Sequence, residues 1–537
     1  MIGILSFVGF TALVAIISYF ATRSTDETTS DGYFLGGRSL TAGVIAGSVL
    51  LTNLSTEQIV GLNGQAYSEG ILVMAWETLA ALAIVVTALF LLPRYLKGGL
   101  TTVPQFLEKR FDRTTKSIVS ALFLSGYMII FLPIVLYSGS LAISTMFNIP
   151  ELLGVSDTAA LWICVWGIGI VGSIYAIFGG LKAVAVSDTI NAIGLLIGGL
   201  MIPVFGLMAI GGGDMFAGLD TLTAANPEKF NSIGGPDASV PFSTIFTGMM
   251  LVQLFYWGTN QAIIQRALAA KNLKEGQKGL MLAAFIKILG PIIVVLPGII
   301  AWHLFQGNLD NPDQAYPALV NEVLPPVLVG FFAAVLFGAI LSSFNSALNS
   351  SVTLFGIDIY KHHFNPGASE SEVVKKGKRF GIVIAVASMF IAPLIANAPQ
   401  GLFGYLQEVN GCYSIPILTI VVVGYLSKKI PAIAAKIALF SGVGLYLVYL
   451  GLKYFVVGED ALPHYLHVMA ILFVLNILIM WVIGRVKPRS TDFVLDYTKQ
   501  VDISPWRYVL PVGLAICALV VFVYVYFASV RNFIPAG

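Results

Sequence analysis

Long apolar runs, separated by short polar and Gly/Pro-rich segments, recur along the whole chain of 537 residues. Runs of about 18 residues or more are long enough, at 1.5 Å per residue, for a helix to cross a hydrocarbon core of about 30 Å. Cutting the chain at its polar segments predicts an all-α polytopic membrane protein with about fourteen transmembrane helices. Their expected centres are residues 11, 53, 82, 130, 168, 197, 250, 292, 343, 386, 414, 441, 474 and 517.

The distribution of Lys and Arg between successive loops supports this count. Cytoplasmic loops are enriched in Lys and Arg, so a correct count places these residues in alternate loops. Of the 30 Lys and Arg residues, 26 fall in the odd-numbered loops, Lys229, Lys453 and Arg531 fall on the other side, and Lys287 lies inside a predicted span. We therefore expect a multi-pass protein of a bacterial inner membrane with both termini outside.

The composition narrows the class of protein. With 57% hydrophobic residues, 11% charged residues and a mean hydropathy of +0.86, the chain lies outside the range of soluble domains, so we expect it to reside in the lipid bilayer. A net charge of +2 offers no basic surface for nucleic acid. No predicted loop is long enough for a second domain, which predicts one transmembrane domain over residues 1–537.

Two ionisable residues interrupt apolar runs, and such residues are functional candidates because a charge near the bilayer centre costs at least ~2.5 kcal/mol. Glu77 lies in ILVMAWETLAALAIVV and Lys287 in GLMLAAFIKILGPIIVV. Their positions in the runs predict depths that differ by only about 7 Å. Two interpretations stay open: a solute site, or a buried ion pair that positions two helices.

Polar residues also interrupt the run AGSVLLTNLSTEQIVGLNGQ around residue 53, which predicts a broken helix beside a polar cavity. Such a break frees carbonyl oxygens, which together with hydroxyls suit a small hard cation. The run GAILSSFNSALNSSVT supplies hydroxyls at Ser342 and Ser343, although a packing face of small residues is an alternative interpretation. A third segment, QLFYWGTNQ (253–261), combines aromatic rings and amides that suit a sugar, or an interfacial aromatic belt.

Six motifs, in order, carry a family resemblance: GYFLGGRSL (32–40), NLSTEQIVG (53–61), YAIFGGLKAVAVSD (175–188), YWGTNQAIIQRALAAK (256–271), SSFNSALNSSVTLFGIDIY (342–360) and YLQEVNG (405–411). The chain resembles the solute:sodium symporter family, in its branch of bacterial sodium/galactose and animal sodium/glucose transporters. The resemblance implies a LeuT-like fold with two inverted repeats of five helices, about 42–210 and 241–426. An extra helix at about 2–20 would precede the repeats, and C-terminal helices at about 431–530 would follow them.

The resemblance also implies roles for individual residues. The sodium ligands would be the carbonyls of Leu51, Leu54 and Ala339 with the hydroxyls of Ser342 and Ser343. Asp188 is similar to an acid on the sodium exit path, or it caps a helix. The solute-binding positions would be Gln58, Glu77, Gln253, Lys287 and Gln407. The gates would be Tyr256, within reach of Asn53 and followed by Trp257, on the inner side, and Leu62, Tyr127 and Phe403 on the outer side.

The chain departs from the family pattern at Gln253, Ala80, Trp76 and Phe131, where the family's sugar carriers have Asn, Ser, Tyr and Asn. We therefore expect a sodium-coupled symporter that imports a neutral polyhydroxylated solute, a monosaccharide, by alternating access, and not an enzyme. Symport of inositol, sialic acid or an amino acid, proton coupling, and a solute sensor or channel are the alternatives.

Overall fold

The computed structural model describes residues 2–22, 29–397, 402–458 and 461–529, and most of them are helical. Position 530, the end of the predicted C-terminal segment, and Arg531 lie outside the described residues. The first half contains α1 (Ile2–Thr22), α2 (Ser30–Leu35), α3 (Ala42–Asn53), α4 (Thr56–Glu69), α5 (Ala75–Val86), α6 (Leu92–Lys97), α7 (Val103–Arg110), α8 (Arg113–Gly126), α9 (Leu132–Phe147), α10 (Ile149–Leu153), α11 (Asp157–Ile210) and α12 (Met215–Ala225).

The second half contains α13 (Phe242–Thr244), α14 (Met250–Gly258), α15 (Gln261–Leu268), α16 (Leu273–Lys287), α17 (Leu296–Phe305), α18 (Ala315–Val323), α19 (Pro326–Thr353), α20 (Glu370–Ile391), α21 (Leu402–Leu426), α22 (Ala432–Leu452), α23 (Tyr465–Val486) and α24 (Val509–Ser529). Short 3₁₀ and π segments join or extend them: η1 (Gly36–Arg38), η2 (Ile71–Met74), η3 (Thr87–Leu91), η4 (Tyr127–Phe131), η5 (Pro227–Phe230), η6 (Ile245–Met249), η7 (Pro291–Val295), η8 (Pro312–Gln314), η9 (Leu354–Phe364), η10 (Ala392–Asn397) and η11 (Lys453–Val457).

Within the described residues, ten helical stretches are long and apolar enough to cross a membrane, and the bent pair Leu273–Lys287 with Pro291–Phe305 adds an eleventh. All fourteen expected centres lie in a helix or at a helix break. Eleven of the centres fall in these stretches. Of the other three, two lie in shorter helical pieces, at the break between α3 and α4 and in 242–258, and the third lies in α1, which is 21 residues long. The all-helical membrane class is therefore established, whereas the count of fourteen and the inverted repeats stay predictions.

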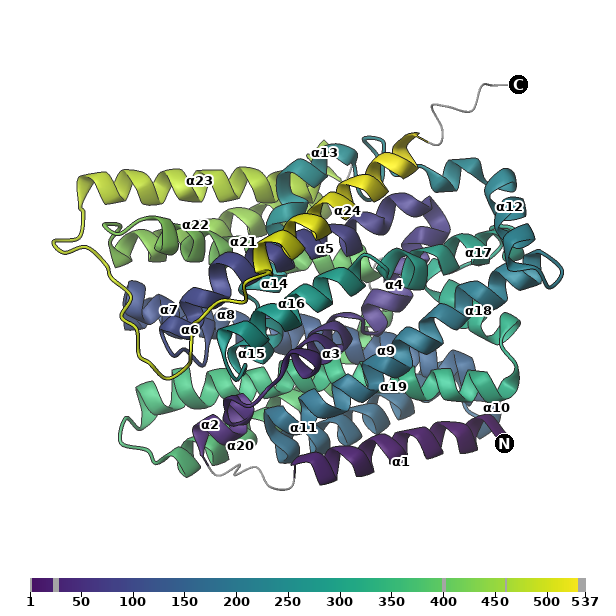
Figure 1. Cartoon of the computed structure of the whole chain (residues 1–537), viewed down its shortest axis with the longest axis horizontal. Helices are drawn as coiled ribbons and strands as arrows, with labels where there is room; N and C mark the ends of the chain where they lie inside the picture. Colours follow the sequence, from purple (N-terminus) through teal and green to yellow (C-terminus); the bar gives the residue numbers. More distant parts are fainter. Residues whose placement is uncertain (1, 23–28, 398–401, 459–460, 530–537) are drawn as a thin grey trace.

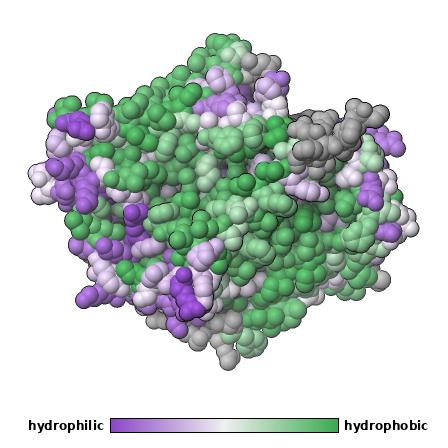
Figure 2. Space-filling view, turned by 45° about the horizontal axis from the view of Figure 1, so that its top comes forward, coloured by the Kyte–Doolittle hydropathy of each residue, from purple (hydrophilic) through white to green (hydrophobic). Residues whose placement is uncertain are grey.

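The helices lie roughly parallel to one another in a bundle (Figure 1). The start of α1 and the end of α24 lie at the same end of the bundle, on the right. At the left end lie α6, α7 and the irregular segment that joins α23 to α24. Figure 2 shows a broad apolar surface across the middle of one face, with hydrophilic residues mainly at the margins. This distribution fits a bilayer that surrounds the middle of the bundle.

The break between α3 and α4 lies inside the bundle. Leu54 (φ −77°, ψ 58°) leaves the helical conformation, and Ser55 (φ −92°, ψ −178°) is extended. The first half of the broken helix, α3, packs against α11, α16 and α19, whereas α4 packs against α9, α17, α18 and α21. The break therefore joins two helices that contact different parts of the bundle.

Candidate functional site

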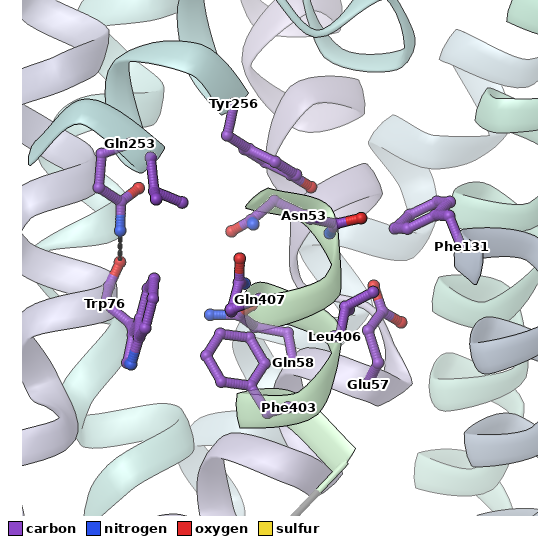
Figure 3. Close-up of a pocket in the computed structure, with 12 residues that line it drawn as sticks. Asn53, Glu57, Gln58, Trp76, Phe131, Gln253, Tyr256, Phe403, Leu406 and Gln407 are labelled. Atoms are coloured by element: carbon purple, nitrogen blue, oxygen red, sulfur yellow. Dashed lines mark hydrogen bonds between the residues drawn. The ribbon is translucent and has the colours of Figure 1, made fainter. Parts of the chain in front are cut away.

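A small cavity lies beside the break between α3 and α4 (Figure 3). Its volume is about 30 Å³, room for only two or three water molecules. Ligand sites for drug-sized molecules usually enclose about 300 Å³ or more, so the structure shows a closed form of this cavity. The lining comes from α3, α4, α5, η4, α14 and α21: Asn53, Glu57, Gln58, Trp76, Phe131, Val252, Gln253, Tyr256, Phe403, Leu406, Gln407 and Asn410.

Glu77 and Lys287 form a buried ion pair behind this lining. The ammonium group of Lys287 contacts Oε2 of Glu77 and donates to Oδ1 of Asn53 at 2.6 Å. Gln58 donates to the other carboxylate oxygen of Glu77 at 2.5 Å. The chain bends near Gly290, where an added Cβ would lie 2.1 Å from the Glu77 carboxylate. The two charges thus compensate each other and, in this closed form, do not line the cavity.

Gln253 is held in place at both ends of its amide. Its Nε2 donates to the carbonyl oxygen of Trp76 at 2.8 Å (Figure 3). Its Oε1 accepts from the indole of Trp257 at 3.0 Å. The Trp76 ring packs edge-on against Phe403, with centroids 5.2 Å apart. A solute that bonds to Gln253 must therefore replace one of these contacts.

The predicted gate residues fall into two groups. Tyr256, Asn53 and Phe403 line the cavity. Leu62 is fully buried one residue after Gly61, whose position contacts Phe403. Tyr127 does not line the cavity, and its hydroxyl donates to Oδ1 of Asn260 at 2.7 Å, at the start of α15.

The predicted sodium ligands lie where α3 meets α19. At the end of α3 the carbonyl groups lose their helical partners because the helix stops. The hydroxyl of Ser343 donates to the carbonyl oxygen of Thr52 at 2.8 Å, and the hydroxyls of Thr52 and Ser342 lie 3.4 Å apart. Ala339 lies one turn earlier on α19 and is fully buried. The structure thus brings the two predicted serine hydroxyls of α19 to Thr52 in the last turn of α3, between the predicted ligands Leu51 and Leu54 in the sequence. Carbonyl and hydroxyl oxygens of this kind fit a monovalent hard cation.

A buried polar network extends from these residues to Asp188. Ser48 donates to Asp188 at 2.6 Å, and the guanidinium of Arg266 donates to Ser48 at 3.3 Å. Arg266 also donates to Ser346, whose hydroxyl lies 2.9 Å from that of Thr52. Asp188 was expected from the sequence, whereas Ser48, Arg266 and Ser346 were not, although Arg266 and Ser346 stand in two of the six motifs.

Glu57 is a cavity residue that the sequence analysis noted only as an interruption of the apolar run. It is 3% exposed and lies in the first turn of α4. Its Oε2 has no hydrogen-bond partner among the described residues. The lining described here combines this one carboxyl with five amides, and it contains no Lys or Arg. Such a surface can accept and donate hydrogen bonds to several hydroxyl groups.

Comparisons with known proteins agree with this architecture. A family model described as the sodium:solute symporter family matches residues 33–442. The chain is 50% identical to the uncharacterized symporter YidK of Escherichia coli (strain K12), over 97% of this chain and 90% of that protein. It is 34% identical to the sodium/glucose cotransporter of Vibrio parahaemolyticus, over 84% of this chain and 86% of that protein.

A solved structure of a Na⁺-coupled sialic acid symporter, in a substrate-bound outward-open state, has a similar fold. Its TM-score is 0.75 at 19% sequence identity, and the match covers 91% of this chain and 99% of the other. At this identity the likeness concerns the fold alone.

Proposed function

The chain belongs to the sodium:solute symporter family, and we propose that it imports a neutral polyhydroxylated solute, a monosaccharide, together with sodium. Like the proteins it resembles, it is a membrane transporter that uses sodium ions and not an enzyme.

The side chains that line the cavity favour a neutral polyhydroxylated solute. Five amides, the Glu57 carboxyl and the Tyr256 hydroxyl offer hydrogen bonds at several positions, and the rings of Trp76 and Phe403 offer apolar faces. Because Lys287 already pairs with Glu77, it offers no free cation to an anionic solute. An anionic solute would also meet the unpartnered oxygen of Glu57, so a neutral solute suits this lining better.

We infer that sodium binds where the carbonyls of Leu51 and Leu54 face Ala339, Ser342 and Ser343. An ion at this position would bridge α3 and α19, and the Ser343 hydroxyl, which now donates to the carbonyl of Thr52, would turn its oxygen toward the ion. Stabilising one arrangement of the broken helix would favour the outward-open form, to which the solute then binds. Asp188, with its hydroxyl partner Ser48, would receive the ion on its way to the cell interior.

Transport then requires the closed cavity to open alternately on each side. Separation of Phe403 from α4 would open the outer path, and rotation of Tyr256 away from Asn53 would open the inner one. The sodium gradient and the membrane potential, about 2.3 kcal/mol per charge per 100 mV, would drive accumulation.

Uptake into proteoliposomes tests this function. Purified protein should accumulate a radiolabelled monosaccharide against its gradient when external sodium is present, and not when potassium replaces it. Labelled myo-inositol, sialic acid and proline, measured in parallel, separate the proposed solute class from its alternatives. Uptake that proceeds unchanged without sodium contradicts the coupling, and transport of only an anionic solute contradicts the solute class.

A further inference from the structure

The irregular segment 487–508, which we call the strap, joins α23 to α24 across the end of the bundle where α6 and α7 lie (Figure 1). Its backbone amides at Arg489 and Phe493 donate to the carbonyls of Lys429 and Lys428 at 2.8 and 3.1 Å. Further along, Thr498 donates to the carbonyl of Lys97 at 3.0 Å. The strap therefore fastens the end of α21 to the end of α6.

A pocket of about 220 Å³ lies between the strap, α6, α7 and α21. Arg94, Lys97 and Lys428 line it, and among the described residues no Asp or Glu does. The strap contains Asp492 and Asp496, but neither lines this pocket. Three cations thus share one concave space without a carboxylate in its lining, and such an arrangement attracts an anion.

The pocket also offers an aromatic wall and hydroxyl donors. The rings of Phe106 and Tyr425 are stacked 4.4 Å apart, and the Arg94 guanidinium lies 4.9 Å from the Tyr425 ring centre. The Tyr425 hydroxyl is buried and has no hydrogen-bond partner among the described residues. Ser427 supplies a second hydroxyl to the lining.

The end of α21 would ordinarily disfavour an anion, because its free carbonyl groups carry partial negative charge. Here Arg110 binds one carbonyl in the last turn of α21 and two carbonyls that follow the helix. Its guanidinium donates to the carbonyl oxygens of Gly424 at 2.9 Å, Ser427 at 2.7 Å and Ile430 at 3.0 Å. The positive field of the pocket is therefore not offset by the helix end.

We propose that this pocket binds the phosphate group of an anionic ligand, which ties the strap to α6 and α21. A phosphate oxygen accepts charge-assisted hydrogen bonds from Arg and Lys, and the aromatic wall accommodates the apolar part of the ligand. The phosphate belongs either to an anionic phospholipid headgroup, which basic pockets between membrane helices bind, or to a soluble phosphate compound, which offers the same oxygens to Arg and Lys. The proposal does not depend on which solute is transported.

A charge-matched pair of variants tests the pocket. The pocket variant carries Arg94→Gln, Lys97→Gln and Lys428→Gln; the control carries Lys429→Gln, Lys487→Gln and Lys499→Gln, which removes the same charge from positions that do not line the pocket. If the triple variant does not fold, the single variants Lys97→Gln, in the pocket, and Lys429→Gln, outside it, replace the two triple variants. We then expect Lys97→Gln to bind the ligand more weakly than Lys429→Gln. Size-exclusion profiles establish folding.

Two measurements separate the sources of phosphate. In the first, inorganic phosphate at constant ionic strength is added to detergent-purified protein and the shift of Tm is followed. In the second, protein taken from vesicles of phosphatidylglycerol and phosphatidylcholine is analysed by native mass spectrometry for retained phosphatidylglycerol. We expect the ligand to bind about tenfold or more weakly to the pocket variant than to the control.

A phosphate-dependent Tm shift that only the pocket variant loses supports a soluble ligand. Loss of one retained phosphatidylglycerol, without a phosphate-dependent shift in any variant, supports a lipid headgroup. If the pocket variant and the control behave alike in both measurements, the proposed site is overturned.

Discussion

The hydroxyl of Ser343 on α19 donates a 2.8 Å hydrogen bond to the carbonyl oxygen of Thr52, in the last turn of α3 before the helix breaks. This contact joins residues that are 291 positions apart in the chain. It places a side-chain oxygen of one helix beside the carbonyl groups that the other helix leaves unpaired, which is the arrangement a small cation requires.

Replacing Ser343 with Ala should weaken the dependence of uptake on sodium. The variant loses one oxygen ligand, so we expect the sodium concentration for half-maximal uptake to rise about tenfold. Ser351→Ala is the matched control, because Ser351 is also buried on α19 and its hydroxyl donates to the carbonyl of Ala347 in its own helix at 2.8 Å. The sodium site would be wrong if both variants kept the wild-type sodium dependence.

Variants of Glu77 and Lys287 should separate a solute-binding role from a purely structural ion pair. Glu77→Ala should abolish solute binding and also lower stability by about 3–5 kcal/mol, since it leaves Lys287 buried without its partner charge. The double variant Glu77→Ala with Lys287→Met should regain stability but not solute binding, as measured by Tm and by labelled solute. Recovery of uptake together with stability would mean that the pair only positions two helices.

Glu57→Gln should weaken solute binding without loss of stability. The carboxyl lines the cavity and has one oxygen without a partner among the described residues, so the change to an amide removes an acceptor for the solute. The same change removes a buried carboxyl, which should not lower stability. We expect KM for the solute to rise about tenfold while Tm stays equal or increases. Glu228→Gln, at an exposed acid outside the cavity, serves as control. An unchanged KM would exclude Glu57 from the solute site.

Gly61→Ala should slow transport by preventing closure on the outer side. A Cβ at Gly61 would lie 2.8 Å from the Cβ and 3.1 Å from the backbone nitrogen of Phe403, so α4 and α21 would have to separate. At Gly404 an added Cβ meets only the flexible amide of Gln65 at 3.0 Å, which makes Gly404→Ala the control. We expect Gly61→Ala to lower kcat about tenfold with little change in solute binding. Equal kcat values in the two variants would contradict this contact as a gate.

Asp313→Asn should alter how stability depends on pH. Asp313 lies in η8, outside the membrane-spanning stretches. Burial raises the pKa of its carboxyl, a hydrogen bond from the backbone of Leu402 opposes this in part, and the resulting pKa is about 6. Because the folded protein holds this proton more tightly than the unfolded chain, stability falls as pH rises from about 4 to 6, and the penalty is complete above that range. The Asn variant should therefore have a higher Tm than wild type at pH 7.5, and the difference should disappear near pH 4. If the Tm of the two proteins differed by the same amount at pH 4 and at pH 7.5, Asp313 would not be the source of this pH dependence.

The positions of the helices, the break at Leu54 and the buried charges at Glu77 and Lys287 could be predicted from the sequence. In a membrane each helix must satisfy its own backbone hydrogen bonds and present an apolar surface, so the local pattern of apolar and polar residues is enough to locate it. A polar interruption such as 52–58 is tolerated only beside a polar interior, which is why the break was predictable. The count of fourteen crossings stays a prediction, because α3, α4 and α14 are each too short to cross a membrane alone.

Which residues face one another was decided by the tertiary structure. Arg266 meets Ser48 and Ser346 because α15 packs against both α3 and α19, and no local pattern records that packing. The exposure of Glu57 to the cavity likewise depends on how α4 is rotated against its neighbours. The closure of the cavity by Trp76 and Phe403 arises from contact between helices more than 300 residues apart. Local hydropathy determines where helices form, whereas side-chain packing between distant helices determines the site that they enclose.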